Sequence, residues 1–381
     1  MSATNGCRTS SRVLCGAFWF MRSAVASLLA LLCYSATASG NSRCAGAALR
    51  GRHTHPQWRD RPAPALWICC FVLLLLLSRA ISPAQNAISV PIHGVTVDDR
   101  NDIRDDVFLK KLLTSLGHLS ETPTTRIVYA PGNKNGSFSA NSYLDATTQI
   151  RGVGPVLGQP VDSFYMKCFT PAEYLSRFKD YVNTLGKVVD IWEVGNEING
   201  EWLFGTTEEC VPQASVKTTS QADVVTKMTD TYDYLKSQGR VTELTLYYNT
   251  PCVRPAANEM FGWVNDHVPA RMKTGLDYVL VSYYELDCNG IRPDWQQVFT
   301  QLAALFPNAK LGFSEFGWSD SRPADESVIK DLISRTYAVH PNVPNWVGGG
   351  FYWEFAIDMV PYDPASGSLW STIDAALKNQ K

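Results

Sequence analysis

Two glutamates far apart in the sequence stand at the ends of short apolar runs, and their setting suits acid–base chemistry. Glu197 closes the run Asp190-Ile-Trp-Glu-Val-Gly-Asn-Glu, and Glu315 closes the run Leu311-Gly-Phe-Ser-Glu. Two carboxyl groups that face each other can divide a glycosidic cleavage between them. One protonates the departing oxygen while the other attacks or stabilises the sugar cation. This chemistry requires a fold that brings the two runs together.

Strand-like and helix-like runs alternate from residue 88 onward. The strand candidates are short, apolar and rich in β-branched or aromatic residues, as expected of strands buried on both faces. They are His93–Val97, Arg126–Ala130, Gly152–Leu157, Val189–Val194, Glu243–Tyr248, Tyr278–Tyr283, Lys310–Phe313 and Trp346–Trp353. The amphipathic segments between them include Pro171–Leu185, Gln221–Gln238, Trp295–Phe306 and Glu326–Tyr337. This order predicts an α/β fold, a (β/α)8 TIM barrel over residues 88–381.

An open doubly wound sheet is the alternative to the barrel. It would need a phosphate-binding turn after the first strand, and the run that begins at His93 has none. Gly152-Val-Gly-Pro-Val-Leu-Gly158 only approaches the G-x-G-x-x-G pattern, and we interpret it as a turn-rich strand end. In a barrel the active site lies at the carboxyl ends of the strands. Glu197 and Glu315 would end the fourth and seventh strands there, across the barrel mouth.

These motifs resemble the clan A glycoside hydrolases, a group of retaining (β/α)8 glycosidases. Asn196-Glu197 ends the fourth strand and a lone Glu315 ends the seventh, as in that clan. Three further matches lie on other strands: Arg126 on the second, Tyr284 or Tyr283 ending the sixth, and Trp353 ending the eighth. The resemblance covers residues 88–381.

The resemblance implies a role for each matching residue. Glu197 would be the general acid/base and Glu315 the nucleophile of a double displacement. Asn196 would hydrogen-bond the sugar 2-hydroxyl, while Arg126 and the strand-six tyrosine would keep Glu315 ionised and aimed. Retention of configuration needs the two carboxyl groups roughly 5–5.5 Å apart.

Two of these assignments have alternatives in the sequence. Arg126 could instead neutralise Glu193, because strand alternation aims Glu193 and Glu197 to the same side. Tyr283 and Tyr284 cannot both point inward, and we expect Tyr284 to do so because it lies nearer the strand end.

The family within the clan stays open. Ile198 stands where Asn-Glu-Pro is usual, and Ser282 stands where many family 5 members have a histidine. The run from Trp192 to Glu197 resembles family 39, whereas Glu315-Phe-Gly-Trp resembles families 5 and 17. The substrate therefore stays open too.

Aromatic residues follow the strands at the same mouth. Trp202, Trp318 and Trp353 could stack on the apolar faces of pyranose rings, and core packing is the alternative for each.

Four cysteines follow the third to sixth strands, on the same rim, and none forms a C-x-x-C pair. They are Cys168, Cys210, Cys252 and Cys288. A zinc ribbon is therefore disfavoured. Our hypothesis pairs neighbours, Cys168 with Cys210 and Cys252 with Cys288.

Other catalytic classes lack their motifs. His93, His118, His267 and His340 form no His-x-His or His-Glu-x-x-His pattern, and the sequence has no Gly-x-Ser-x-Gly elbow or phosphate loop. We therefore expect neither a metal nor a cofactor.

Charge divides the chain into two parts. The formal net charge of −2 resolves into about +8 over residues 1–85 and −10 over the remainder. This balance excludes the basic surface of a dedicated nucleic-acid binder, so no nucleic-acid partner is expected.

The first 85 residues predict an export leader, otherwise disordered. Their apolar runs, Ala24–Leu32 and Ala65–Leu77, are shorter than the roughly 20 residues needed to span a bilayer. Small residues follow the second run, which favours a signal peptide within 64–84 cleaved near Ala84. A retained membrane anchor through 65–77 and a buried core helix are the alternatives. Whether the leader is cleaved as a signal peptide or retained as an anchor, we expect the protein outside the cytoplasm, as a secreted, periplasmic or cell-surface protein.

Together these features predict a monomeric, retaining β-glycoside hydrolase that acts on a β-linked oligo- or polysaccharide. A catalytically silent glycan-binding barrel and a transglycosylase on the same scaffold are the alternatives. Two glutamates in catalytic positions favour an enzyme over a binding protein.

Overall fold

The computed structural model of the protein describes residues 88, 90–98, 100–133, 136–205, 210, 219–252, 255–319 and 321–381. The predicted leader over residues 1–85, with its signal peptide or anchor at 64–84, lies outside these residues. Within the described part, none of the helices is both long and apolar enough to cross a membrane.

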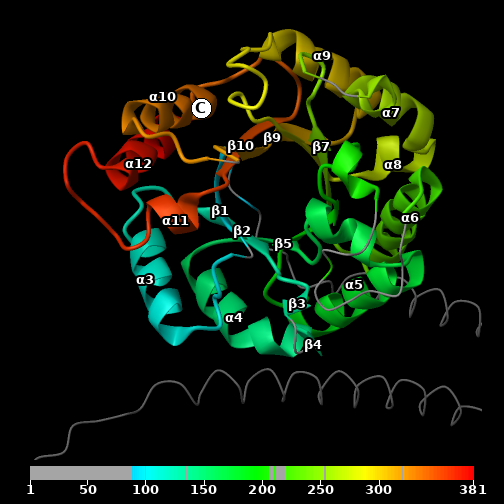
Figure 1. The fold of residues 1–381 in the computed structure, drawn as a ribbon, viewed down its shortest axis with the longest axis horizontal. Helices are drawn as coiled ribbons and strands as arrows, with labels where there is room; N and C mark the ends of the chain where they lie inside the picture. The colour runs from blue at the N-terminus through cyan, green and yellow to red at the C-terminus, as the bar shows by residue number, and fades with distance from the viewer. Residues whose placement is uncertain are drawn as a thin grey trace, which may run out of the picture. The chain divides into compact units, whose positions relative to one another are not determined.

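Eight parallel strands close into a barrel, which confirms the predicted (β/α)8 fold (Figure 1). In chain order the strands are β1 (Ile92–Val97), β2 (Thr124–Val128), β5 (Val156–Gln159), β6 (Ile191–Gly195), β7 (Thr242–Tyr247), β8 (Tyr278–Ser282), β9 (Lys310–Phe316) and β10 (Trp346–Tyr352). Each strand pairs with the next in this order, and β1 pairs with β10 to close the ring. The carboxyl ends of all eight strands therefore meet at one mouth.

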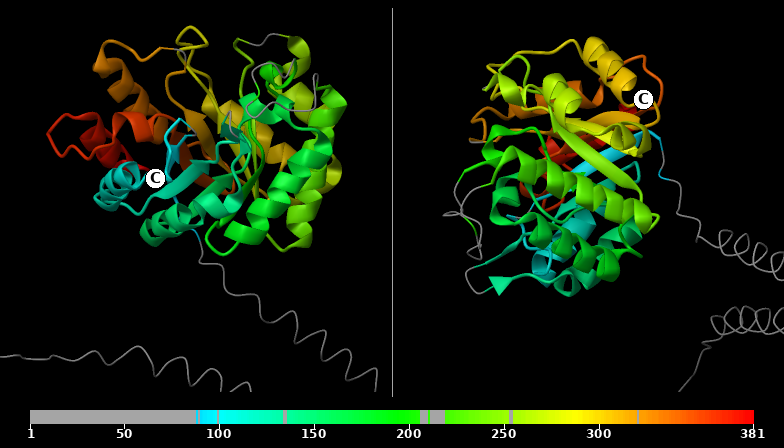
Figure 2. Two further views of the ribbon diagram at one scale, coloured as in Figure 1. Left: turned by 60° about the horizontal axis from the view of Figure 1, so that its bottom comes forward. Right: turned by 90° about the vertical axis from the view of Figure 1, so that its right-hand side faces the viewer.

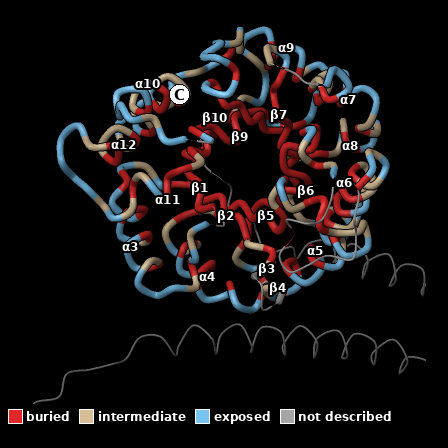
Figure 3. The backbone as a smooth tube through the Cα atoms, viewed as in Figure 1, coloured by how far each residue is buried: buried red, intermediate tan, exposed pale blue. Residues whose placement is uncertain are grey.

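Helices surround the barrel, as Figures 1 and 2 show from three sides. The longer ones are α3 (Asp106–Gly117), α4 (Leu144–Val153), α5 (Pro171–Leu185), α6 (Gln221–Ser237), α7 (Met260–His267), α9 (Trp295–Leu305), α10 (Glu326–Tyr337) and α12 (Leu369–Asn379). Shorter elements are α8 (Ala270–Gly275), α11 (Phe355–Asp358), the 3-10 turns η1 (Ala140–Tyr143), η2 (Ser163–Cys168), η3 (Glu201–Leu203) and η4 (Ala256–Asn258), and the β3–β4 hairpin (Gly132–Asn133 and Gly136–Ser137). In Figure 3 the strands are buried and exposed residues lie on the outer side of the helices.

Local sequence explains where the helices begin. Helix α5 starts with a capping box, in which the Thr170 hydroxyl accepts from the Glu173 amide and the Glu173 carboxylate accepts from the Thr170 amide. Pro171 occupies the first turn, where its missing N–H costs nothing. Ser220 and Asp223 form the same box at α6. Such caps satisfy backbone groups that the first helical turn would otherwise leave unpaired.

Several predicted strand boundaries differ from the structure by up to four residues, and the start of the third strand differs most. Gly152 and Val153 end helix α4 rather than begin a strand, and β5 starts only at Val156. Pro155 disfavours a helical conformation in the residue before it, so the chain becomes extended at Gly154. A side chain at Gly154 would collide with the Pro123 carbonyl oxygen, which accounts for the glycine.

The barrel interior has an apolar layer and a polar layer. The apolar cluster contains Ile92, Leu157, Ile191, Tyr278, Leu280, Val347 and Phe351. Gly94 makes room for Phe351, because a Cβ there would lie 2.8 Å from the ring. Along β6, Ile191 is followed two residues later by Glu193, which lies at the start of the polar layer. The polar layer therefore lies nearer the carboxyl ends of the strands.

Candidate active site

The two predicted catalytic glutamates lie together at the carboxyl ends of the strands. Glu315 belongs to β9, and Glu197 follows β6 by two residues. Their exposed fractions are 3% and 6%. Each carboxyl group is thus largely removed from water. Charges and hydrogen bonds act more strongly in such buried surroundings than they do in water.

Three side chains hold the Glu315 carboxylate. Nη2 of Arg126 lies 2.6 Å from its Oε1. Asn196 Nδ2 donates to the same oxygen over 2.7 Å, and Tyr284 Oη donates to Oε2 over 3.0 Å. Burial, and then the negative Glu315, raise the pKa of Tyr284 well above its ordinary value, so its hydroxyl stays a donor. Both oxygens of Glu315 are therefore fixed by donors that lie on β2 or just after β6 and β8.

Arg126 combines the two alternatives that the sequence left open. Its Nε and Nη2 donate to the two oxygens of Glu193, each over 2.9 Å, while Nη2 also reaches Glu315. The guanidinium is completely buried. A planar guanidinium that binds one carboxylate in bidentate fashion has a fixed orientation. Glu193 therefore orients the cation that contacts Glu315.

A fourth carboxyl group lies in the polar layer, opposite Glu193 on the neighbouring strand β7. Glu243 is fully buried, and its Oε1 accepts from the Thr245 hydroxyl over 3.0 Å. Burial, and then the nearby Glu193, raise the pKa of Glu243 well above its ordinary value. Burial likewise raises the pKa of Glu193, although Arg126 opposes that shift.

The surroundings of Glu197 favour a proton. Burial, and then the negative charge of Glu315, raise the pKa of Glu197 well above its ordinary value, while the Ser282 hydroxyl opposes the shift. Its Oε2 accepts from the Ser163 hydroxyl over 3.4 Å, and its buried Oε1 has no hydrogen-bond partner within the described part of the chain. Glu197 thus holds a proton more readily than an ordinary glutamate, beside the Glu315 side chain that three donors hold.

Glu197 has an unusual backbone conformation. Its φ of 43° lies in the left-handed region, which costs a residue with a side chain about 1–3 kcal/mol. The segment after it is tightly bound. The Ile198 amide donates to the Thr245 carbonyl over 3.2 Å, and the Gly200 amide donates to the Glu197 carbonyl over 2.7 Å.

A network of asparagine amides fixes this segment to the next loop. Asn199 Nδ2 donates to the carbonyls of Tyr247 (2.8 Å) and Asn258 (3.0 Å), and its Oδ1 accepts from the Tyr247 amide over 2.8 Å. Asn258 Nδ2 donates back to the Asn199 carbonyl over 2.9 Å. Asn249 Nδ2 also donates to the Asn258 carbonyl, over 2.9 Å. These bonds stabilise the turn that carries the strained Glu197.

The two tyrosines after β8 separate as expected. Tyr284 contacts Glu315, whereas the Tyr283 hydroxyl donates to the Ile291 carbonyl over 2.7 Å. The Tyr283 ring packs at 5.3 Å from the Trp295 ring, outside the barrel.

The three predicted tryptophans differ in their surroundings. Trp353 is partly exposed, with its ring centre 5.6 Å from the Arg126 guanidinium carbon. Trp202 is partly exposed and donates its Nε1 hydrogen to the Ser163 hydroxyl over 2.9 Å. Trp318 is 8% exposed and donates to Asp358 over 3.1 Å. Trp353 and Trp202 are thus partly exposed residues beside the side chains that contact the two glutamates, and Trp318 is mostly packed.

Two disulfides join the loops of this rim. Cys168 pairs with Cys210 and Cys252 with Cys288, at Cα–Cα distances of 5.5 and 5.3 Å. These are the pairs assumed from the sequence. Each links the loops after two neighbouring strands.

Sequence reasoning missed several residues that shape the site. Ser163 contacts Asn196 and Glu197, while Asn199 holds the turn after Glu197. The rule that barrel loops after strand ends carry function points to their general position but does not select them. Within the described ranges, no group of three or more His, Cys, Asp or Glu side chains could hold a metal ion.

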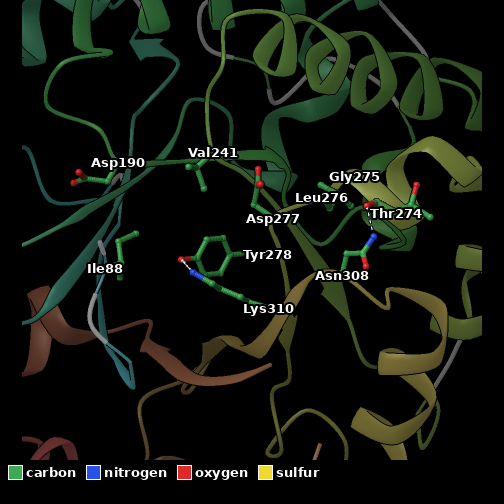
Figure 4. Close-up of a pocket in the computed structure, with 10 residues that line it drawn as sticks. All are labelled: Ile88, Asp190, Val241, Thr274, Gly275, Leu276, Asp277, Tyr278, Asn308 and Lys310. Carbon is green, nitrogen blue, oxygen red and sulfur yellow. Dashed lines mark hydrogen bonds between the residues drawn. The ribbon is translucent and has the colours of Figure 1, made fainter. Parts of the chain in front are cut away.

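A cavity of about 340 Å³ lies at the opposite end of the barrel (Figure 4). Its lining includes Asp190, Val241, Tyr278 and Lys310, which stand at or just before the starts of strands. Its Asp277 accepts from the Thr242 amide over 2.8 Å, so this carboxylate serves the barrel's own backbone. In a barrel this end contributes to stability rather than to catalysis.

The sequence matches no protein-family model. A comparison with curated proteins finds no match either. Among solved structures, a GH5-4 broad specificity endoglucanase from an uncultured bacterium aligns with a TM-score of 0.51 and 12% identity, over 79% of this chain and 97% of that one. This likeness establishes the shared barrel fold.

Two further structures align less closely. Gas2p of Saccharomyces cerevisiae, in complex with laminaritriose and laminaritetraose, has a TM-score of 0.45 and 13% identity over 78% of this chain. An FMN-binding beta-glucuronidase from Facaelibacterium prausnitzii L2-6 has a TM-score of 0.42 and 15% identity over 70% of this chain. The chain spans 66% and 38% of their respective lengths.

Proposed function

We propose that this protein is a retaining β-glycoside hydrolase of the clan A type, which cleaves a β-linked oligo- or polysaccharide. The observation that carries the proposal is the contrast between the two carboxyl groups. Glu315 is fixed by Arg126, Asn196 and Tyr284, whereas the pKa of Glu197 is raised beside it. An attacking carboxylate and a proton-bearing acid are the two partners that glycosidic double displacement requires.

In the first step Glu315 attacks the anomeric carbon of the sugar. The bond from that carbon to the glycosidic oxygen breaks, and Glu197 gives its proton to the departing oxygen. A glycosyl ester of Glu315 results, and Glu197 becomes a carboxylate.

In the second step Glu197 removes a proton from water. The water oxygen bonds to the anomeric carbon, the ester bond breaks, and Glu315 is restored as a carboxylate. Two inversions leave the configuration of the anomeric carbon unchanged. If a sugar hydroxyl replaced water, the same residues would perform transglycosylation.

Neighbouring side chains suit the binding of a sugar. An amide nitrogen carries two hydrogens, so Asn196 could donate one to Glu315 and the other to a sugar hydroxyl. Trp353 and Trp202 are partly exposed residues near the carboxyl groups, where a pyranose could stack on an indole ring. Trp318 would then support the structure of the site through its hydrogen bond to Asp358.

A substrate panel tests the proposal. Nitrophenyl β-glycosides of glucose, xylose, mannose and galactose, together with β-glucan, xylan, mannan and galactan, should include at least one substrate of the wild-type protein. Glu315→Ala should lose nearly all of that activity, while Glu326→Ala, a change at an exposed glutamate of α10, should keep it. Equal activity of wild type and Glu315→Ala would refute the nucleophile assignment. Binding of a glycan with no turnover of any substrate would favour a silent glycan-binding barrel.

We also infer that the enzyme is exported. The apolar run with small residues after it at 64–84 supports this, and so do the two disulfides, because such bonds persist in oxidising compartments. Thiol titration of denatured, unreduced residues 82–381 should find no free thiol. Two or more free thiols would contradict the pairing.

A further inference from the structure

Ser163, the first residue of η2, lies between three side chains of the proposed site. It is 5% exposed. Its backbone amide donates to Asn196 Oδ1 over 2.8 Å. Its hydroxyl oxygen accepts from Trp202 Nε1 over 2.9 Å and lies 3.4 Å from Oε2 of Glu197. A single residue of the loop after β5 therefore contacts the proposed acid/base, its neighbour and a tryptophan of the rim.

The chemistry of these contacts fixes the direction of each hydrogen bond. An indole N–H can only donate, so the Ser163 oxygen must accept from Trp202. The one hydroxyl proton is then free to point at Oε2 of Glu197, and once Glu197 is ionised its carboxylate can only accept.

The amide contact has a separate effect. Because the Ser163 N–H requires an acceptor, it selects the oxygen of the Asn196 side chain and leaves the nitrogen to face Glu315. Ser163 thereby determines the orientation of the amide between the two carboxyl groups.

The loop that carries Ser163 is anchored at several points. Asp162 caps the turn by accepting from the Phe164 amide over 2.8 Å. The buried Lys227 of α6 donates to the Met166 carbonyl over 3.0 Å. The Cys168–Cys210 disulfide holds the end of the turn. These anchors limit how far Ser163 can move away from Glu197.

We propose that Ser163 is a positioning residue for the proposed acid/base: its hydroxyl supports the negative charge that Glu197 acquires as it gives up its proton, and its amide orients Asn196. The hydroxyl donates most strongly to a carboxylate, so its contribution is larger after proton transfer than before it. The chemical part of this inference rests on the proposed glycosidase function.

Leaving-group dependence distinguishes this role from general support of the fold. A dinitrophenolate departs with little help from an acid, whereas a phenolate or a sugar needs the proton of Glu197. Ser163→Ala should therefore reduce kcat/KM about tenfold for the phenyl β-glycoside of whichever sugar the wild type cleaves. The matching dinitrophenyl β-glycoside should react almost as fast as with wild type.

Two companion variants complete this experiment. Ser163→Thr keeps a hydroxyl and should restore most of the phenyl glycoside activity. Ser142→Ala removes an exposed hydroxyl that contacts only its own turn and should leave both rates unchanged. Equal losses on the two substrates with Ser163→Ala, or no loss at all, would overturn the proposal.

A measurement without substrate separates this proposal from the proposed function. In carbon-13 NMR titrations of the glutamate carboxyls, with the Glu197 signal assigned from its absence in Glu197→Gln, the Ser163→Ala protein should show a higher pKa for Glu197 than wild type. The reason is that the lost donor had stabilised the ionised form. Unchanged titration in Ser163→Ala would overturn the coupling of Ser163 to Glu197. A shifted titration in a protein that cleaves no glycoside would instead refute the glycosidase function alone.

Discussion

At the residue scale, the two central glutamates are the same amino acid in opposite surroundings. Glu315 accepts from Asn196 and Tyr284 and pairs with Arg126, while Glu197 forms no ion pair with any described residue and receives a long contact from Ser163. Burial beside a negative neighbour favours the protonated form of Glu197. In the proposed mechanism, environment rather than residue type therefore divides the roles of acid and nucleophile.

A Glu197→Gln variant tests this division. Glutamine fills the same space but can neither give nor take the proton, so kcat/KM for a phenyl β-glycoside should fall by about 10²–10⁴-fold. Formation of the glycosyl-enzyme from a dinitrophenyl β-glycoside should change little, because that leaving group needs no acid. Pre-steady-state release of dinitrophenol measures this first step directly.

A uniform loss on both substrates would contradict an acid/base role for Glu197. Glu121→Gln, a change at a glutamate outside the site, is the matched control and should leave both rates at the wild-type level.

At the element scale, the loops after the strands determine the geometry of the site. The turn after β6 carries the strained Glu197 and is bound through Asn199 to the loop after β7. A strained residue persists where the surrounding structure constrains it on several sides. The asparagine network supplies that constraint here.

Asn199→Ala should therefore weaken both the fold and the site. It removes three buried hydrogen bonds, two of them to backbone groups of Tyr247, at an expected cost of about 3 kcal/mol in the free energy of unfolding. Urea unfolding measures this cost, and kcat should fall because the backbone at Glu197 can relax. Asn379→Ala, at an exposed amide of α12, should change neither quantity measurably. Equal behaviour of the two variants would show that the network does not support the turn.

Much of the architecture could be predicted from the sequence, because strands buried on both faces have a distinct apolar pattern. Helices Pro171–Leu185 and Glu326–Tyr337 begin and end where the sequence indicates. The predicted start of the third strand is wrong because helix α4 continues through Gly152 and Val153, and the chain becomes extended only at Gly154. Periodicity alone does not reveal that a glycine is required by close contact with another chain segment.

The residues of the candidate site likewise fall into those that the sequence predicts and those that it does not. Glu197, Glu315, Arg126 and Tyr284 could be predicted because a barrel places strand ends at one mouth. Ser163 and Asn199 could not, since their partners depend on loop conformations that the local sequence does not encode.

At the scale of the whole molecule, the described part of the chain keeps several carboxyl groups in surroundings that favour their protonated form. The pKa values of Glu193, Glu197, Glu243 and Glu354 are all raised, with burial as the largest cause. Glu193, Glu197 and Glu243 lie near the proposed site, and Glu193 differs from the other two because both of its oxygens accept from Arg126.

Stability should therefore decrease as the pH rises. Above the ordinary glutamate pKa of about 4.3, the folded protein holds protons that the unfolded chain has lost, so deprotonation favours unfolding. Each such proton contributes a slope of about −1.4 kcal/mol per pH unit until the pH passes the raised pKa. Denaturant unfolding at a series of pH values between about 5 and 8 measures the slope.

Glu243→Gln provides the matched comparison, because it makes one of these groups permanently neutral. Its free energy of unfolding should depend less on pH than that of wild type. Stability that increases over this range, or an unchanged slope in the variant, would contradict the protonated state of the barrel interior.

Covalent trapping tests the central claim most directly. Dinitrophenyl 2-deoxy-2-fluoro-β-glycosides form the glycosyl-enzyme but slow its hydrolysis, because the fluorine destabilises both cationic transition states. Offered the gluco, xylo, manno and galacto forms, the wild-type protein should gain the mass of one sugar per chain. Peptide mapping should place that sugar on Glu315, and Glu315→Gln should not be labelled. A sugar on any other carboxylate, or a protein that hydrolyses β-glycosides yet is never labelled, would contradict the account.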